Sequence, residues 1–166
     1  VNDNAMVDIT DECVFTDNGA HLEVAAKATA SRNSLFQQSR NGVAIAVVEG
    51  GELTLDDCTV SGEATCAVSN AGKATIRSSK IMDCGVCGLF WTGEHASGDI
   101  TNNEILRNGP CGIEIMGGSC NVSDNEIKSH SAFGIHVDKS AELTENGNDF
   151  EKNTVANVNR AEEAAK

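Results

Sequence analysis

Hydrophobic and polar residues alternate along the chain in one pattern, which recurs about every 22 residues and occurs seven times. Each repeat has two apolar residues separated by one polar residue, as in Leu53 and Leu55. A small polar residue follows, then an apolar residue two places later, a turn, and a second apolar run. Alternation with a period of two is typical of β-strands that bury one face. The pattern therefore predicts three short strands in each repeat and no helix in the body of the chain.

The small polar residue of each repeat forms a column with spacings of 20, 25, 21, 24, 22 and 23 residues. Its members are Cys13, Asn33, Cys58, Ser79, Asn103, Asn125 and Asn148. The apolar residues two places later are Phe15, Leu35, Val60, Ile81, Ile105, Ile127 and Phe150. If successive repeats stack as neighbouring strands, the members of a column lie ~4.8 Å apart. Buried Asn side chains can then hydrogen-bond along the stack, so the sequence predicts an asparagine ladder.

Two more columns lie in the second apolar run of each repeat. The first comprises Ala20, Val43, Cys66, Cys87, Cys111, Phe133 and Val155. The second is made of small residues, apart from His21 in the first repeat, and comprises Ala44, Ala67, Gly88, Gly112, Gly134 and Ala156. We expect the first column, with its three cysteines, to face the core. In the seventh repeat Asn157 and Asn159 replace aliphatic residues, which predicts that the last coil frays.

The clearest repeats read Asn-x-Ile, a short turn, then Gly-Ile-x-Ile or Gly-Ile-x-Val, at 103–115 and 125–137. This phrase resembles the repeat of the right-handed parallel β-helices of the pectate-lyase-like superfamily. The resemblance covers roughly residues 7–158. It implies an all-β fold, a right-handed single-stranded parallel β-helix (a solenoid) of about seven coils. A left-handed β-helix is the main alternative, but its six-residue turns are more regular. A leucine-rich repeat would need a Leu-x-x-Leu-x-Leu frame, which this chain lacks.

One uninterrupted repeat predicts one domain, which we place at residues 1–158. The segment 159–166 is rich in Ala, Glu and Lys, which favours a short C-terminal helix or tail.

The net charge of −13 and the isoelectric point near 4.5 argue against nucleic acid or an anionic membrane as a partner. The longest apolar stretch, 43–48, is too short to insert into a membrane. Seven cysteines, mostly at apolar positions, favour a reducing intracellular compartment or organelle over secretion.

The resemblance also implies motifs that an enzyme of this fold would carry. Lyases use an Asp cluster that binds calcium, with an Arg as base. Hydrolases carry Asn-Thr-Asp, Asp-Asp, Gly-His-Gly and Arg-Ile-Lys, and only Asp56-Asp57 matches here. We therefore predict no catalytic residues, no metal site and no cofactor. Asp99, Asn121 and Glu142 of adjacent coils could supply paired carboxylates for a carbohydrate-active site, although a solvated strand face has the same composition.

One outward-facing column reads Glu23, Ala46, Ser69, Phe90, Glu114, His136 and Val158. Glu114 and His136 would be vertical neighbours, as an acid/base pair or as an ordinary surface pair. Phe90 should point outward, as the aromatic anchors of interfaces do. The only tryptophan, Trp91, follows it, and the register favours an inward position for Trp91. The candidate binding residues are therefore Phe90, Trp91, Glu114 and His136.

The inward columns account for most of the recognisable pattern, and no outward column shows a catalytic constellation. We therefore expect a non-enzymatic scaffold or protein-interaction module, as a subunit or domain of a larger assembly. Its partner would be another protein bound to an outward face of the solenoid. The alternative is a carbohydrate-active β-helix resembling lyases, hydrolases or epimerases, or a carbohydrate-binding module.

Overall fold

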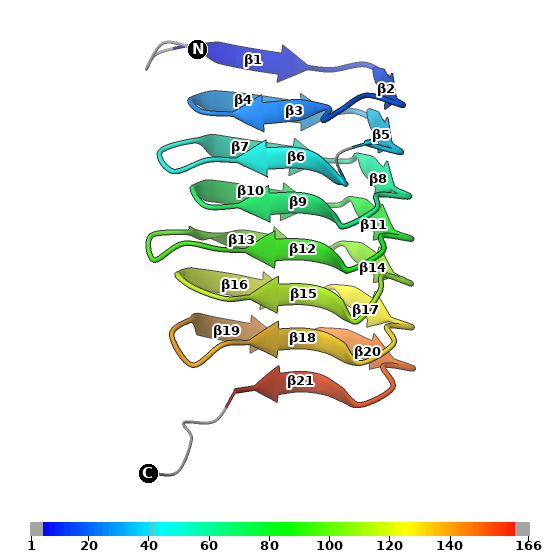
Figure 1. The fold of residues 1–166 in the computed structure, drawn as a ribbon, viewed down its shortest axis with the longest axis vertical. Helices are drawn as coiled ribbons and strands as arrows, with labels where there is room; N and C mark the ends of the chain where they lie inside the picture. The colour runs from blue at the N-terminus through cyan, green and yellow to red at the C-terminus, as the bar shows by residue number, and fades with distance from the viewer. Residues whose placement is uncertain (1–4, 41, 162–166) are drawn as a thin grey trace.

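The computed structural model describes residues 5–40 and 42–161. The described chain winds into stacked coils, with its two ends at opposite ends of the stack (Figure 1). Within the described residues, each complete coil contributes one strand to each of three parallel sheets, A, B and C, and each sheet has seven strands. The predicted all-β solenoid of about seven coils is confirmed. No helix in this part of the chain is long and apolar enough to cross a membrane.

Sheet A forms one side of the solenoid, and its strands bury alternate residues, as period-two alternation predicts. Its strands are β1 (Met6–Ile9), β4 (Lys27–Ser31), β7 (Glu52–Asp56), β10 (Lys73–Arg77), β13 (Ser97–Thr101), β16 (Ser119–Ser123) and β19 (Glu142–Asn146).

Sheet B has the shortest strands, three residues each, and every central residue points inward. Its strands are β2 (Val14–Thr16), β5 (Leu35–Gln37), β8 (Thr59–Ser61), β11 (Lys80–Met82), β14 (Glu104–Leu106), β17 (Glu126–Lys128) and β20 (Asp149–Glu151).

Sheet C closes each coil. Its strands are β3 (Leu22–Val24), β6 (Val43–Val47), β9 (Cys66–Asn70), β12 (Cys87–Trp91), β15 (Cys111–Ile115), β18 (Phe133–Val137) and β21 (Ala156–Arg160). Residues from all three sides meet in one core. In the fourth coil these are Ile76, Ile81 and Leu89, which are all fully buried.

A column of inter-coil hydrogen bonds runs along the bend between sheets A and B. The Oδ1 atom of Asn125 accepts from the backbone N–H and from the side-chain amide of Asn103, both at 2.9 Å. Asn125 in turn donates to Oδ1 of Asn148. The column continues upward through Ser79, which accepts from the N–H of Cys58 at 3.1 Å. Each member therefore satisfies a buried backbone donor of the preceding coil.

In the second coil the member of this column is Ser34, and the prediction of Asn33 was wrong. Ser34 is fully buried, whereas Asn33 is exposed. The buried apolar residue is accordingly Phe36, which pairs with Val60, and not Leu35. The bend contains one additional residue, since Arg32 and Asn33 both have positive φ angles, of 59° and 60°.

A second column of inter-coil hydrogen bonds, which the sequence analysis missed, runs along the bend between sheets B and C. Among the described residues its members are Ser39, Glu63, Cys84, Asn108, His130 and Asn153. As in the first column, each backbone N–H is satisfied by the side chain of the next coil. The residue preceding a member has a positive φ angle, for example Arg107 at 51° and Ser129 at 65°. Two left-handed bends therefore flank each short strand of sheet B.

The seventh coil does not fray within the described residues. Strand β21 pairs with β18, so that Ala156 lies opposite Phe133 and Val158 lies opposite Ile135. The predicted register was therefore one residue too early, and Val155 is 66% exposed. The strand also extends two residues past the expected domain boundary at 158. The predicted helix or tail falls mostly on 162–166, outside the described residues.

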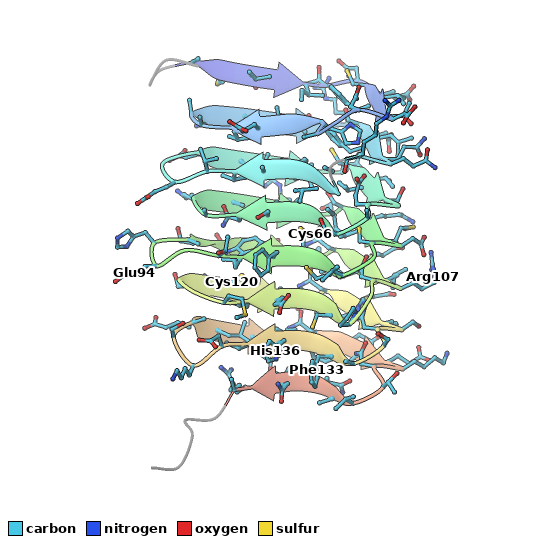
Figure 2. The ribbon with its side chains drawn as sticks, in the orientation of Figure 1. Cys66, Glu94, Arg107, Cys120, Phe133 and His136 are labelled. Carbon is cyan, nitrogen blue, oxygen red and sulfur yellow. The ribbon has the colours of Figure 1, made fainter. Side chains whose placement is uncertain are left out.

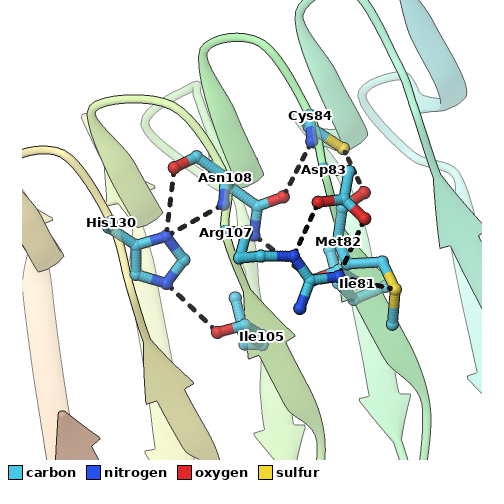
Figure 3. A network of polar contacts seen from close by, with 8 residues as sticks. All are labelled: Ile81, Met82, Asp83, Cys84, Ile105, Arg107, Asn108 and His130. Atoms are coloured by element: carbon cyan, nitrogen blue, oxygen red, sulfur yellow. Dashed lines mark hydrogen bonds and ion pairs between the residues drawn. The ribbon is translucent and has the colours of Figure 1, made fainter. Parts of the chain in front are cut away.

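His130 is the only histidine of the second column among the described residues, and Figure 3 shows its contacts. Its Nδ1 accepts from the N–H of Asn108 at 3.2 Å. Its Nε2 lies 3.1 Å from the carbonyl oxygen of Ile105, which can only accept, so Nε2 carries the proton. Burial lowers the pKa of His130 from its ordinary 6.5, against the opposing effect of the backbone contacts with Asn108 and Ile105.

This environment predicts that the protein loses stability as the pH falls below 6.5. The unfolded chain protonates His130 first, so the unfolded state binds more protons between 6.5 and the lower pKa of the folded state. The contribution is complete above 6.5 and is lost as the pH falls through this window. His130→Asn restores the hydrogen bonds that its neighbours Asn108 and Asn153 make, and should flatten the pH dependence of the urea midpoint down to about pH 5. The exposed His95→Asn is the control, and an equal flattening there would contradict the assignment.

Candidate functional site

Three of the four candidate binding residues share one outward column of sheet C. Phe90 of β12 lies directly opposite Glu114 of β15, and Glu114 lies opposite His136 of β18. All three side chains are half-buried. The predicted vertical pairing of Glu114 and His136 is therefore confirmed. In the seventh coil the column ends at Asn159, not at Val158 as predicted.

Trp91 does not belong to this surface, and its inclusion among the binding residues was wrong. Its side chain is 0% exposed and lies in the main core. Strand alternation places it on the opposite face from Phe90, as the register favoured. The indole Nε1 is buried without a hydrogen-bond partner in the described part of the protein. Trp91 thus contributes to the core and cannot contact a partner in this fold.

The cysteines of sheet C lie outside the core, contrary to the prediction. Cys66, Cys87 and Cys111 form a separate buried cluster with Val43, Phe90 and Phe133 packed against it. Figure 2 shows Cys66, Phe133 and His136 along the same sheet.

The reason for this outward direction is the small residue that follows each cysteine. A Cβ on Gly88 would lie 2.7 Å from the Asn108 side chain and 3.1 Å from that of Ile81, so position 88 faces the interior. Leu89 faces the interior as well, because it is fully buried in the main core. With two consecutive inward positions, alternation is broken, and both Cys87 and Phe90 face outward.

An apolar groove of about 300 Å³ lies over this cluster. It is lined by Val43, Thr65, Cys66, Ser69, Val86, Cys87, Phe90 and Glu114. Val86 on its rim is 44% exposed. The groove joins an aromatic side chain, two thiols and one carboxylate on a rigid sheet, so it can receive a small apolar group and place a polar atom against Glu114.

Glu114 and His136 do not form an ion pair in the described structure, although they are neighbours. Nδ1 of His136 instead lies 2.8 Å from the amide nitrogen of Asn159. The imidazole stacks on Phe133, with ring centroids 5.4 Å apart. His136 is thus held by Phe133 and Asn159. These contacts do not orient it as the partner of a carboxylate in acid/base catalysis.

A buried carboxylate, that of Glu63, lies near the N-terminal end of the stack, between β8 and β9. Glu63 accepts from the N–H of Ser39 at 2.7 Å and from the Ser39 hydroxyl. Its other oxygen lies 3.8 Å from Nε2 of His21, and both side chains are fully buried. The group resembles a catalytic constellation in composition, but it lies in the second hydrogen-bond column with no exposed side-chain atoms. We assign it to the structure of the bend.

The carbohydrate candidates on sheet A are only partly brought together. Asn121 donates to the carboxylate of Asp99 at 2.9 Å, as expected for adjacent coils. Glu142, however, pairs with Ser119, and Thr144 lies opposite Asn121. The proposed trio therefore spans two columns. Across residues 5–40 and 42–161, no group of three His, Cys, Asp or Glu side chains could hold a metal ion.

A family model described as "right handed beta helix region" matches residues 1–157. The chain belongs to this family. Its coil of three strands, with two bends of hydrogen-bonded polar residues, is therefore a right-handed β-helix. No curated protein and no solved structure shows significant similarity to the chain. Membership of the β-helix family establishes the fold and leaves the activity to be argued from the surface.

Proposed function

We propose that this β-helix is a non-enzymatic interaction module that binds another protein through the outer face of sheet C, as part of a larger assembly. The observation that carries the proposal is the apolar groove at Phe90. The inward residues of each coil are committed to the core and to the two hydrogen-bond columns. The outward columns are not needed for core packing or for the two hydrogen-bond columns, and the stacked coils present them as a rigid surface. A half-buried aromatic beside an apolar hollow is a common anchor of protein interfaces.

The charges around the groove support a partner of complementary, basic character. Glu114 lines the groove, and Glu23 lies in the same outward column. The described strands β3 to β18 of sheet C contain no Lys or Arg. The whole chain carries a net charge of −13. The complementary partner is therefore a protein segment that inserts an apolar side chain into the groove and places a neighbouring Lys or Arg against Glu114.

A displayed library of random peptides, selected on the wild-type protein, tests this proposal. We expect the enriched peptides to share a large apolar residue next to Lys or Arg. Phe90→Asp should weaken the best peptide by about 30-fold, since it places a charge at the anchor position. Glu114→Gln should cost about threefold and reduce the dependence on salt.

Leu106→Asp is the matched control for this experiment. Leu106 is also half-buried and faces outward, but from sheet B, so the same chemical change there should leave peptide affinity unaltered. Circular dichroism of each variant is used to check that it is folded. Peptides that bind Phe90→Asp as well as wild type, or that are enriched in acidic residues, would refute the proposed surface.

Carbohydrate binding is the second candidate, and the outer face of sheet A favours it. Thr54, Thr75, Asp99 and Asn121 line up in one column there, and their hydroxyl, carboxylate and amide groups can hydrogen-bond to sugars. The described strands of that sheet, β1 to β19, carry no aromatic residue on which a sugar ring could stack. Incubation with uronic-acid polymers, with and without calcium, tests for cleavage at this face, and retention of the protein on an immobilised polymer tests for binding alone. Unsaturated products detected by absorbance would overturn the non-enzymatic proposal.

A further inference from the structure

Three thiols are stacked at the base of the groove, in adjacent strands of sheet C. Cys66 is the direct register partner of Cys87, and Cys87 is the register partner of Cys111. Register partners on neighbouring strands lie ~4.8 Å apart. Disulfides join residues whose Cα atoms are about 4.4–6.8 Å apart. Both pairs therefore have a backbone separation that a disulfide can bridge, and all seven cysteines are free thiols in this structure.

Cys66 has a different environment from the other buried thiols. The Cys87 thiol, as a hydrogen-bond partner, lowers the pKa of Cys66 against the opposing effect of burial. Burial instead raises the pKa of Cys58 and of Cys111 to about 11, and that of Cys84 to about 12. The thiolate is the form of cysteine that attacks disulfides. Cys66 also lines the groove, whereas Cys58, Cys84 and Cys120 lie in the main core.

We propose that Cys66 and Cys87 are a redox-active thiol pair that reduces small disulfides entering the groove, with Cys66 as the attacking thiol and Cys87 as the resolving thiol. The inference is independent of whether a protein partner binds the same face. Glu114 beside the groove and the net charge of −13 favour neutral or cationic disulfides over anionic ones.

The reaction balances without any further reactant. The Cys66 thiolate, having released its proton to solvent, attacks one sulfur of the small disulfide. A mixed disulfide forms on Cys66, and the first small thiolate leaves. Cys87 then loses its proton to that thiolate and attacks the Cys66 sulfur, which forms the Cys66–Cys87 disulfide and releases the second small thiolate. This thiolate takes up the equivalent of the proton that Cys66 gave to solvent. Two protein thiols are oxidised by the loss of two electrons and two protons, and one small disulfide is reduced to two small thiols.

The first step prepares the second. In the reduced protein the hydrogen bond with Cys66 is the largest cause that raises the pKa of Cys87, followed by burial and by the Cys66 charge. Formation of the mixed disulfide removes both the thiolate charge and this hydrogen bond. Cys87 can then ionise more readily and attack the neighbouring sulfur.

The resulting disulfide should be easily reduced again. On parallel neighbours the Cβ atoms lie about as far apart as the strands, ~4.8 Å. Disulfides prefer about 3.5–4.5 Å between Cβ atoms, so this bond forms under strain, and strained disulfides are more readily reduced. Cys111 is the competing partner for Cys87. It does not line the groove, and its raised pKa keeps it protonated, so it does not start the reaction.

The probes for the test are cystamine, which is cationic, and bis(2-hydroxyethyl) disulfide, which is neutral. They are added to the full chain carrying Cys13→Ser, because Cys13 is the one cysteine that is only partly buried. Intact mass and peptide mapping then follow the products. We expect the loss of two hydrogens, with a Cys66–Cys87 link that dithiothreitol reverses. Cystamine should react about tenfold faster than oxidised glutathione, which is anionic.

Variants in the same background identify each role. The Cys87→Ser protein should stop at a mixed disulfide on Cys66, because the serine hydroxyl keeps a hydrogen-bond donor beside Cys66 but cannot resolve the adduct. Cys66→Ala should slow the reaction of the remaining sheet C thiols with cystamine by about tenfold or more. Cys111→Ala, from the same cluster, should still form the Cys66–Cys87 link at the wild-type rate. Where Cys66→Ala fails to fold by circular dichroism, Cys66→Ser takes its place, and trapping of the mixed disulfide in Cys87→Ser gives an independent readout.

Several results would overturn the proposal. These are wild-type protein that gives no link, a predominant Cys87–Cys111 link, an unchanged rate in the Cys66 variant, or Cys87→Ser protein that carries no adduct on Cys66. None of these outcomes bears on peptide binding at Phe90, so failure of the thiol pair is distinguishable from failure of the proposed interaction surface.

Discussion

Asn125→Ala is expected to lower the free energy of unfolding by about 3 kcal/mol, as a result of losing buried hydrogen bonds that water cannot replace. The Asn125 side chain accepts from the backbone N–H of Asn103 and donates to the carbonyl of Ile100, each at 2.9 Å. Asn125 is 1% exposed. Removal of the amide leaves the Asn103 donor and the Ile100 acceptor buried without partners, and each such group costs about 1–3 kcal/mol.

Urea unfolding followed by far-ultraviolet circular dichroism measures this effect. Asn121→Ala is the matched control in the same coil, since Asn121 is exposed on sheet A and bonds only to Asp99 in the described structure. Its cost should stay within about 0.5 kcal/mol. Equal destabilisation by the two variants would show that the column of hydrogen bonds does not stabilise the coil stack.

The repeat and the three-strand coil could be predicted because inward residues follow strict physical rules. Most of the first hydrogen-bond column could be assigned because it lies three residues after a buried strand residue, as Asn125 follows Val122. The second coil broke this rule through a second residue with positive φ at the bend, which shifts the column from Asn33 to Ser34. Leu35 and Phe36 are both apolar, so the sequence offered two candidates for this core position, and the structure buries Phe36.

The register error in the seventh coil also had a signal in the chain. Cys58 precedes Cys66 by eight residues, and Asn103 precedes Cys111 by eight. The same step from Asn148 gives Ala156, the residue that pairs with Phe133 in the structure. Because Val155 is aliphatic, it was assigned to the column of Phe133 in place of Ala156.

The direction of the sheet C cysteines could not be read from alternation. Gly88 and Leu89 both face the core, and a break of this kind leaves no hydrophobic signature, because a glycine fits either side. Cysteine is also one of the most frequently buried residue types, so its apolar character favoured the core in error. The groove and its thiols became visible only with the three-dimensional arrangement.

The second hydrogen-bond column was not predicted because its members differ in residue type. Glu63, Cys84 and His130, for example, occupy equivalent positions in different coils.

Trp91→Ala should destabilise the protein by about 3–5 kcal/mol, the usual cost of removing a fully buried large aromatic side chain. Its neighbours along the inward column are Asn70 and Ile115, which are both fully buried. The adjacent Phe90→Ala is the matched control, because its half-buried ring faces the groove, and should cost about 1 kcal/mol. Trp91→Phe should cost much less than Trp91→Ala, since it keeps most of the volume and removes the buried Nε1–H that has no partner in the described structure. Unfolding is followed by circular dichroism, as the substitution removes the only tryptophan. A larger loss of unfolding free energy in Phe90→Ala than in Trp91→Ala would show that Phe90, and not Trp91, faces the core. The groove could then not lie over Phe90.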